Sequence, residues 1–236
     1  MIDYSISTGE TTLFCKVSGS GEPLLLLHGN EEDHTIFEHQ IPFLSKFYQV
    51  IALDSRGHGR SDHGEECLTF QRMAEDVVTV LDYFELEKTN IIGFSDGGNL
   101  GLYVASHFPI RVDNLIVVGA NYKSNGLKTK EFLYVKGLFY YLKVSGYISK
   151  AKQKRMEIID LMWHQLKLNE KDLKNITART LVVVGENDVI KKKHSEVMHT
   201  LLLKSTIITI PEATHFLMIE KPDVFNSIVR DFLLKK

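Results

Sequence analysis

A serine flanked by glycines is the first residue in this sequence that could do chemistry. Ser95 lies in Gly-Phe-Ser-Asp-Gly, residues 93–97, between a short apolar run at 90–92 and a segment of helical period at 97–107. Glycines two positions before and after the serine permit a sharp strand-to-helix turn that exposes its hydroxyl. The N-terminus of the following helix favours a developing oxyanion. The pattern predicts a nucleophile, and the alternative is an ordinary helix N-cap.

A serine nucleophile needs a base within hydrogen-bond reach, and the base must be oriented by a third group. His215 follows an apolar run at 206–210, and Asp188 follows another at 181–184. The carboxyl ends of parallel strands meet at one edge of a sheet, so both side chains are expected near Ser95. We predict His215 as general base and Asp188 as the orienting acid, with Glu186 as a rival carboxylate.

The elements that would position these residues alternate along the chain. Short runs rich in apolar and β-branched residues are separated by longer segments of helical period, and Thr69 is a candidate N-cap for the first helix. Several runs are apolar at every position, as in strands covered on both faces. The expected fold is therefore α/β, with a mostly parallel sheet and helices on both faces. Strands are expected at 12–17, 24–27, 50–53, 90–92, 115–118, 181–184 and 206–210, and helices at 69–84, 97–107, 192–203 and 222–234.

One stretch interrupts the alternation. Residues 121–176 show helical period only, with Phe132, Val135, Phe139 and Leu142 on one face. This stretch has 12 Lys and Arg against 5 Asp and Glu, whereas the rest of the chain is acidic. We expect a helical insertion at 121–176 within a core of residues 1–120 and 177–236. It is either a basic lid over an acidic body or a pair of helices with solvated lysines on their exposed faces. Its aromatic residues are expected mostly to pack between cap and core.

Composition narrows the classes of partner. The 236 residues have a formal net charge of −2, which predicts neither a nucleic-acid partner nor a membrane partner. The first residues lack a basic and apolar leader, so a cytoplasmic location is expected. Cys15 and Cys67 form no metal or redox motif. The acidic and histidine-containing segment at 31–39 matches no defined ligand spacing, so no metal is expected.

Four motifs in order resemble the α/β-hydrolase superfamily over nearly the whole chain. They are Leu-His-Gly-Asn at 27–30, Asp-Ser-Arg-Gly-His-Gly-Arg-Ser at 54–61, the turn at 93–97, and Gly-Glu-Asn-Asp at 185–188. The resemblance implies a cap after the sixth strand and an oxyanion hole formed by the backbone N–H groups of Asn30 and Asp96. It also implies structural roles for His28 and His58. Some relatives hold the acid after the preceding core strand, but Asn121 stands there in this chain.

The expected activity is hydrolysis of a small carboxylic ester through an acyl-enzyme, without a cofactor, by a monomer or homodimer. The carboxylate of Asp96 beside the nucleophile suggests an ester carrying a cationic amino group, because the Ser-Asp-Gly-Gly turn resembles that of hydrolases acting on amino-acid esters. Asp96 could instead interact only with its own helix N-terminus. Trp163 of the cap is a further candidate for substrate contact. Three alternatives stay open: carbon–carbon bond hydrolysis, cofactor-free perhydrolysis, and a slow-turnover ligand sensor.

Overall fold

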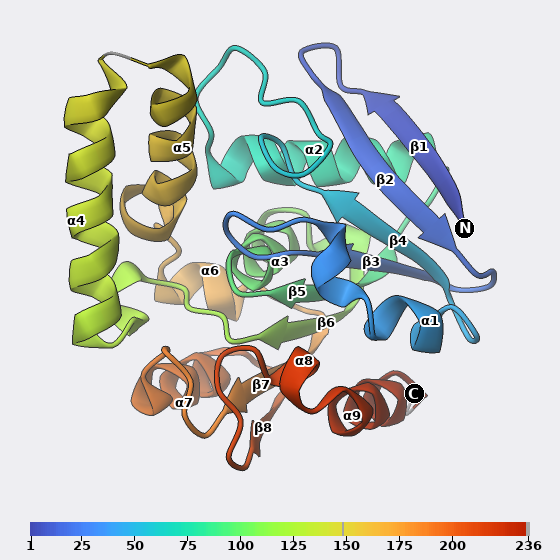
Figure 1. Ribbon diagram of the computed structural model, residues 1–236. Coiled ribbons are helices and arrows are strands. Elements are labelled where there is room, and N and C mark those ends of the chain that lie inside the picture. The colour runs from blue at the N-terminus through green and yellow to red at the C-terminus, as the bar shows by residue number, and fades with distance from the viewer. Residues whose placement is uncertain (148, 235–236) are drawn as a thin grey trace.

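An eight-stranded sheet forms the centre of the computed structural model, which describes residues 1–147 and 149–234 (Figure 1). The strand order is β1-β2-β4-β3-β5-β6-β7-β8. β1 and β2 pair antiparallel with their neighbours, and all later pairings are parallel. The expected α/β class with a mostly parallel sheet is confirmed. The strands are β1 (Ile2–Ser7), β2 (Thr12–Ser18), β3 (Pro23–Leu27), β4 (Gln49–Asp54), β5 (Thr89–Phe94), β6 (Val112–Val118), β7 (Arg179–Gly185) and β8 (Ser205–Ile210).

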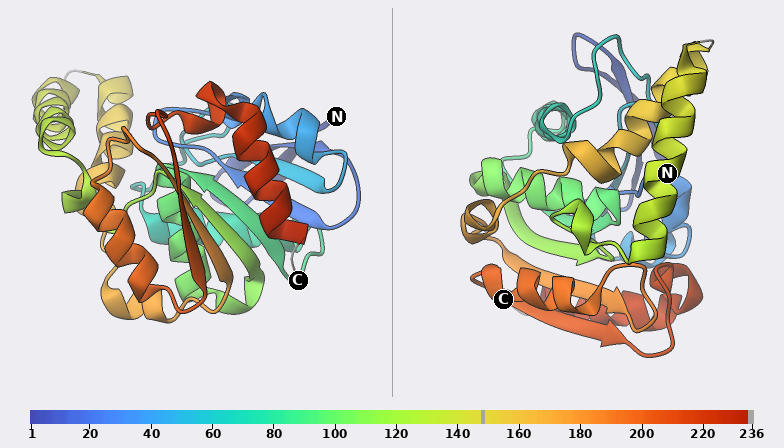
Figure 2. Two further views of the ribbon diagram at one scale, coloured as in Figure 1. Left: turned by 90° about the horizontal axis from the view of Figure 1, so that it is seen from below. Right: turned by 90° about the vertical axis from the view of Figure 1, so that its left-hand side faces the viewer.

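Helices cover both faces of the sheet, which explains why the central strands are apolar at nearly every position (Figure 2). The first face carries α2 (Phe70–Tyr83), α3 (Asp96–His107), α6 (Glu170–Lys174) and α7 (Lys192–Leu201). The second carries α1 (Gln40–Leu44), α8 (Leu217–Glu220) and α9 (Pro222–Leu234). Shorter turns are η1 (His34–Phe37), η2 (Pro109–Arg111), η3 (Ser124–Gly126) and the π-helical η4 (Leu161–Gln165).

Local signals account for several element boundaries. The hydroxyl of Thr69 accepts a hydrogen bond from the Arg72 N–H, so Thr69 is the N-cap of α2 as expected. Strand β1 was not expected from the sequence. It lies at the edge of the sheet and most of its side chains are exposed, so it lacks the apolar pattern of a covered strand.

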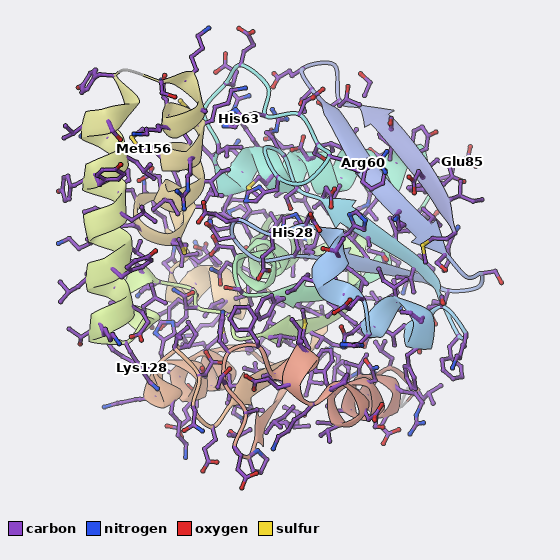
Figure 3. The ribbon with its side chains drawn as sticks, viewed as in Figure 1. His28, Arg60, His63, Glu85, Lys128 and Met156 are labelled. Carbon is purple, nitrogen blue, oxygen red and sulfur yellow. The ribbon has the colours of Figure 1, made fainter. Side chains whose placement is uncertain are left out.

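The cap lies between β6 and β7 and consists chiefly of α4 (Thr129–Gly146) and α5 (Lys150–Asp160), which pack side by side at one end of the sheet (Figures 1 and 2). Their contact surface centres on Val135, Phe139, Leu142 and Ile159, and Met156 lies between the two helices (Figure 3). The chain from 161 to 176 instead buries its leucines in the core of the sheet. The chain therefore leaves the cap within η4, where Met162 and Trp163 still pack with the cap, and residues 166–176 belong to the core rather than to the cap.

The aromatic residues of the cap divide into two groups. Phe132, Phe139 and Trp163 pack against each other edge to face. Four tyrosines are more than half exposed, contrary to the expectation that the cap aromatics pack against the core. They are Tyr134, Tyr140, Tyr141 and Tyr147. Helix α4 carries apolar residues all round, so its period alone did not distinguish the inner face from the outer one.

None of the described helices combines the length and the apolarity needed to cross a bilayer.

Candidate active site

Ser95 occupies the tight turn between β5 and α3. Its backbone has φ 52° and ψ −119°, in the left-handed region that residues with side chains rarely adopt. Two glycines make this turn possible. A β-carbon at Gly93 would lie 2.2 Å from the Gly97 carbonyl oxygen, and one at Gly97 would lie 2.1 Å from the Leu27 carbonyl oxygen. The strained turn holds the Ser95 hydroxyl at the carboxyl end of β5.

His215 and Asp188 reach Ser95 from the loops after β8 and β7. His215 Nε2 lies 3.0 Å from Ser95 Oγ, and its Nδ1 lies 2.8 Å from Asp188 Oδ1. Burial opposes ionisation of Asp188, but hydrogen bonds from His215 and from the Ile190 and Gly185 N–H groups hold its pKa below the usual value. Asp188 is therefore a buried carboxylate that can orient the imidazole and stabilise its charged form. The rival, Glu186, is exposed and accepts a hydrogen bond from the Glu212 N–H.

The backbone N–H groups of Asn30 and Asp96 make no hydrogen bond to an acceptor of the described residues. The Gly29 N–H is already engaged, because it donates to Glu32 Oε2 at 2.9 Å. Asn30 follows β3, and Asp96 begins α3, where the helix dipole also favours an anion. These are the two donors that the sequence predicts for an oxyanion hole.

The carboxyl group of Asp96 is buried beneath the cap. Its Oδ2 accepts from Asn30 Nδ2 at 2.8 Å and its Oδ1 from Asn99 Nδ2 at 2.9 Å. Burial raises its pKa to about 6, and the two amide hydrogen bonds oppose that rise. Asn30 Nδ2 also donates to the Ile158 carbonyl at 2.7 Å, so one amide links the oxyanion turn, Asp96 and the cap.

Glu32 is a second unusual carboxyl group, and its sequence position gave no sign of it. A β-carbon at Gly29 would lie 2.6 Å from Glu32 Oε2 and 3.1 Å from Ser95 Cβ, so both side chains lie against the same glycine. Burial raises the pKa of Glu32 to about 7, while the Gly29 N–H and the charge of His215 oppose the rise. Its proximity to the nucleophile depends on the fold of the loop after β3, which local sequence does not specify.

A cavity of about 360 Å³ opens between the core and the cap, with Ser95, Asp96 and His215 among its lining residues. Its volume is at the low end of the range for small-molecule sites. Its apolar walls come from Leu127, Val135, Met162, Val189 and Ile190. Asn121, which stands at the alternative acid position, also lines it and pairs with Asn99.

Trp163 does not line this cavity, contrary to expectation. Its ring stacks on His164, with centroids 4.0 Å apart, and meets Phe132 and Phe139 edge to face within the cap. The preceding residue, Met162, faces the cavity instead. Consecutive residues of a helical turn point in different directions, which is enough to exchange the two roles.

His28 and His58 pack against each other in the turns next to the site. His28 Nε2 accepts a hydrogen bond from the Ser55 N–H at 2.9 Å, and its Nδ1 lies 2.7 Å from the Gly29 carbonyl. Burial lowers the pKa of His28 to about 4, so the ring is neutral near pH 7. His58 Nδ1 lies 3.0 Å from the Arg56 carbonyl. Both rings support the loops on which the site is built, and His28 lies near the middle of the molecule in Figure 3.

One group of potential metal ligands occurs in the described residues: Asp33, His34 and Asp54, whose ligand atoms lie within 4.8 Å of one another. Asp54 Oδ1 already accepts from the His34 N–H at 2.7 Å, and Oδ2 accepts from the Arg60 N–H at 2.9 Å. The His34 imidazole also contacts Oδ1 at 2.8 Å. These hydrogen bonds explain why the three side chains lie together, because they join the segment after β3 to the end of β4 and the loop that follows it.

Comparison with known proteins places this arrangement in a family. A family model described as alpha/beta hydrolase fold matches residues 22–160. The chain belongs to this family. The match includes the turn at Ser95 and the loop of Asn30. Membership in this family supports the conclusion that the protein is a hydrolase.

Two relatives illustrate the range of similarity. The AB hydrolase superfamily protein YisY of Bacillus subtilis (strain 168) is 39% identical over 120 residues, which cover 50% of this chain and 45% of that protein. The chain therefore spans less than half the length of that relative. The serine hydrolase BPHL of Homo sapiens is 25% identical over 264 residues, covering 95% of this chain and 88% of that protein.

Solved structures share the fold over the full length. An esterase, EaEST, from Exiguobacterium antarcticum superposes with a TM-score of 0.83 at 22% identity, covering 98% of this chain and 99% of that one. The meta-cleavage product hydrolase CumD of Pseudomonas fluorescens IP01 gives 0.80 at 22% identity, covering 98% and 97%. By name, one of these proteins is an esterase and the other hydrolyses a meta-cleavage product, so the shared fold does not decide the substrate.

Proposed function

We propose that this protein is a serine hydrolase that cleaves small carboxylic esters through an acyl-enzyme. One observation carries the proposal: Ser95 Oγ, His215 and Asp188 form a continuous hydrogen-bonded chain at the wall of an apolar cavity. A packed fold does not require these three side chains to meet at a strained turn. Their geometry is that of a nucleophile, a base and an orienting acid.

In the acylation step, Ser95 Oγ attacks the ester carbonyl carbon while His215 Nε2 takes the hydroxyl proton. The Asn30 and Asp96 N–H groups stabilise the negative charge that develops on the carbonyl oxygen. Asp188 accepts a hydrogen bond from Nδ1 and stabilises the imidazolium. When the tetrahedral intermediate collapses, the alcohol leaves with the proton returned by His215.

In the deacylation step, His215 removes a proton from water, which attacks the acyl carbon. The second tetrahedral intermediate uses the same two N–H donors. Its collapse breaks the bond to Ser95 Oγ, which recovers its proton from His215, and the carboxylic acid is released. All proton transfers use one imidazole, so the residues present suffice for the reaction.

Asp96 supports a preference for esters that carry an amino group close to the carbonyl. Each of its carboxyl oxygens accepts one amide hydrogen bond, and an ionised carboxylate has capacity for more. Asp96 and Ser95 line the same cavity. Burial raises the pKa of Asp96, so the protein stabilises its ionised form poorly. A substrate ammonium would compensate this negative charge.

The mechanism is tested by the Ser95→Ala variant with a short-chain aryl ester. We expect at least a 1,000-fold loss of kcat, because the hydroxyl is the covalent nucleophile. The Ser106→Ala variant, in the same helix α3 but outside the cavity, is the matched control and should retain activity. A serine-reactive fluorophosphonate should label the wild type and the control at Ser95. Substantial esterase activity in Ser95→Ala would refute the proposal.

A further inference from the structure

Glu131 has one carboxyl oxygen that no donor among the described residues satisfies. It lies in the first turn of α4 and lines the same cavity as Ser95 and Asp96. Its Oε2 atom is buried and has no hydrogen-bond partner among the described residues. Eight buried side-chain atoms of the described residues have no partner, and Glu131 Oε2 is the one carboxyl oxygen among them. It is also the one among them whose residue lines this cavity, and an unpaired buried polar atom destabilises the fold.

The helix that carries Glu131 does not supply the missing partner. α4 has Lys128 as its N-cap, without a side-chain capping hydrogen bond, and Glu131 makes no capping contact. The helix dipole favours a negative charge in this turn, but it does not satisfy the carboxyl oxygen. Lys128 itself projects into solvent at the start of α4 (Figure 3).

Apolar side chains line the cavity beside Glu131, together with the exposed side chains of Lys130 and Tyr134. Val135, one turn further along the same face of α4, lines the cavity, and so does Met162 of η4. These side chains can contact a hydrocarbon chain but cannot donate hydrogen bonds. Asp96 lies in the core helix α3 and Glu131 in the cap, so the cavity has one carboxyl group from each side.

We propose that Glu131 binds a cationic group at the end of the substrate's acyl chain, so that the preferred substrates are esters of diamino acids such as lysine. The ammonium near the carbonyl pairs with Asp96, the aliphatic chain lies along the apolar walls, and the terminal ammonium pairs with Glu131. This inference rests on the proposed ester hydrolysis and adds the chemistry of the far end of the substrate.

Lys130 would instead favour a substrate whose far end carries a negative charge. It also lines the cavity, but its side chain is exposed. Consecutive residues on a helix point about 100° apart, so Lys130 and Glu131 do not face the same point. A substrate with a terminal carboxylate would select Lys130, and the test below separates the two.

The experiment compares kcat/KM for four ethyl esters of matched length: those of lysine, norleucine and hexanoic acid, and the α-ester of 2-aminoadipic acid. For the wild type we expect lysine to exceed norleucine at least 10-fold. In Glu131→Gln that ratio should fall to near 1, while the ratio of norleucine to hexanoate stays unchanged. Glu170→Gln, which alters an acid in the first turn of α6 outside the cavity, is the matched control and should keep the wild-type ratios.

The outcomes separate the two proposals. If norleucine ester is cleaved but lysine ester is not preferred, the inference about Glu131 is wrong and the ester hydrolase stands. Preference for the aminoadipate ester would assign the far end of the cavity to Lys130. If no ester is cleaved, the proposed function fails, and binding of free lysine against norleucine to Ser95→Ala by calorimetry still decides the role of Glu131. Thermal unfolding of Glu131→Gln, measured beside the kinetics, should stay close to that of the wild type, because the amide keeps the size of the side chain.

Discussion

The role of Asp96 predicts a pH-dependent choice between two esters that differ only in an amino group. The perturbation is Asp96→Asn, which keeps the size of the side chain and removes its charge. A hydrogen bond to a charged partner contributes about 1.5–3 kcal/mol, or roughly 10-fold to 150-fold in kcat/KM. The wild type should therefore prefer norleucine ethyl ester to ethyl hexanoate by about that factor near pH 7, and the variant should show little preference.

The pH profile of this preference follows from the ionisation of both partners. Burial raises the pKa of Asp96 to about 6, so below that pH the carboxyl becomes neutral and the ratio of the two kcat/KM values should fall. Above about pH 8 the amino group of the ester loses its own proton, and the ratio should fall again. Any pH effect that both esters share cancels in the ratio.

The assay measures kcat/KM for each of the two esters from pH 5 to pH 9, in the wild type and in Asp96→Asn, and the two values are compared as a ratio. Asp223→Asn is the matched control, because Asp223 is also an acid in the first turn of a helix but is exposed. A ratio that is flat with pH in the wild type, or unchanged in Asp96→Asn, would refute the reasoning. Hydrolysis of ethyl hexanoate should fall less than that of the amino ester. The oxyanion contact of residue 96 comes from its backbone, but the new amide NH2 faces the Nδ2 donor of Asn30 or Asn99, so both rates are compared as a ratio.

Two further predictions concern the remaining carboxyl groups. Asp188→Asn should lower kcat about 10,000-fold with the fold intact, because the amide no longer holds His215 in the required tautomer. Steady-state kinetics measure the loss, and circular dichroism checks the fold. A near-normal kcat would point to another acid. Burial raises the pKa of Glu32 from the ordinary 4.5 to about 7. Between these two pH values the folded protein keeps a proton on Glu32 that the unfolded chain has lost. The free energy of unfolding should therefore fall as the pH rises from about 4.5 through about 7. Glu32→Gln should remove that fall and gain up to about 3 kcal/mol at pH 8 without a gain at pH 4; urea unfolding at both values measures it, and parallel pH profiles would contradict it.

Much of the fold was predictable because its signals are local. The runs at 24–27 and 181–184 are apolar at every position, as strands covered on both faces must be, and both lie within strands of the structure. Helix α9 has the predicted bounds, Pro222–Leu234, because a proline at its start and an amphipathic period define it. β1 was missed because an exposed edge strand has no such pattern. The boundary of the cap was placed too late because helical period does not tell which surface a helix covers.

The sequence by itself determined the three residues at the centre of the proposed chemistry. Ser95 follows from glycine spacing around a turn, and Asp188 and His215 from their places after strands, all of which are readable along the chain. Only the tertiary structure decided the environment of the charges. Asn30 reaches Asp96 across 66 positions and Ile158 across 128, and Glu32 meets the Ser95 turn only through the loop after β3. The affinity of a carboxyl group for its proton depends on burial and on such distant neighbours, which is why Asp96 and Glu32 acquire their chemical character only in the folded molecule.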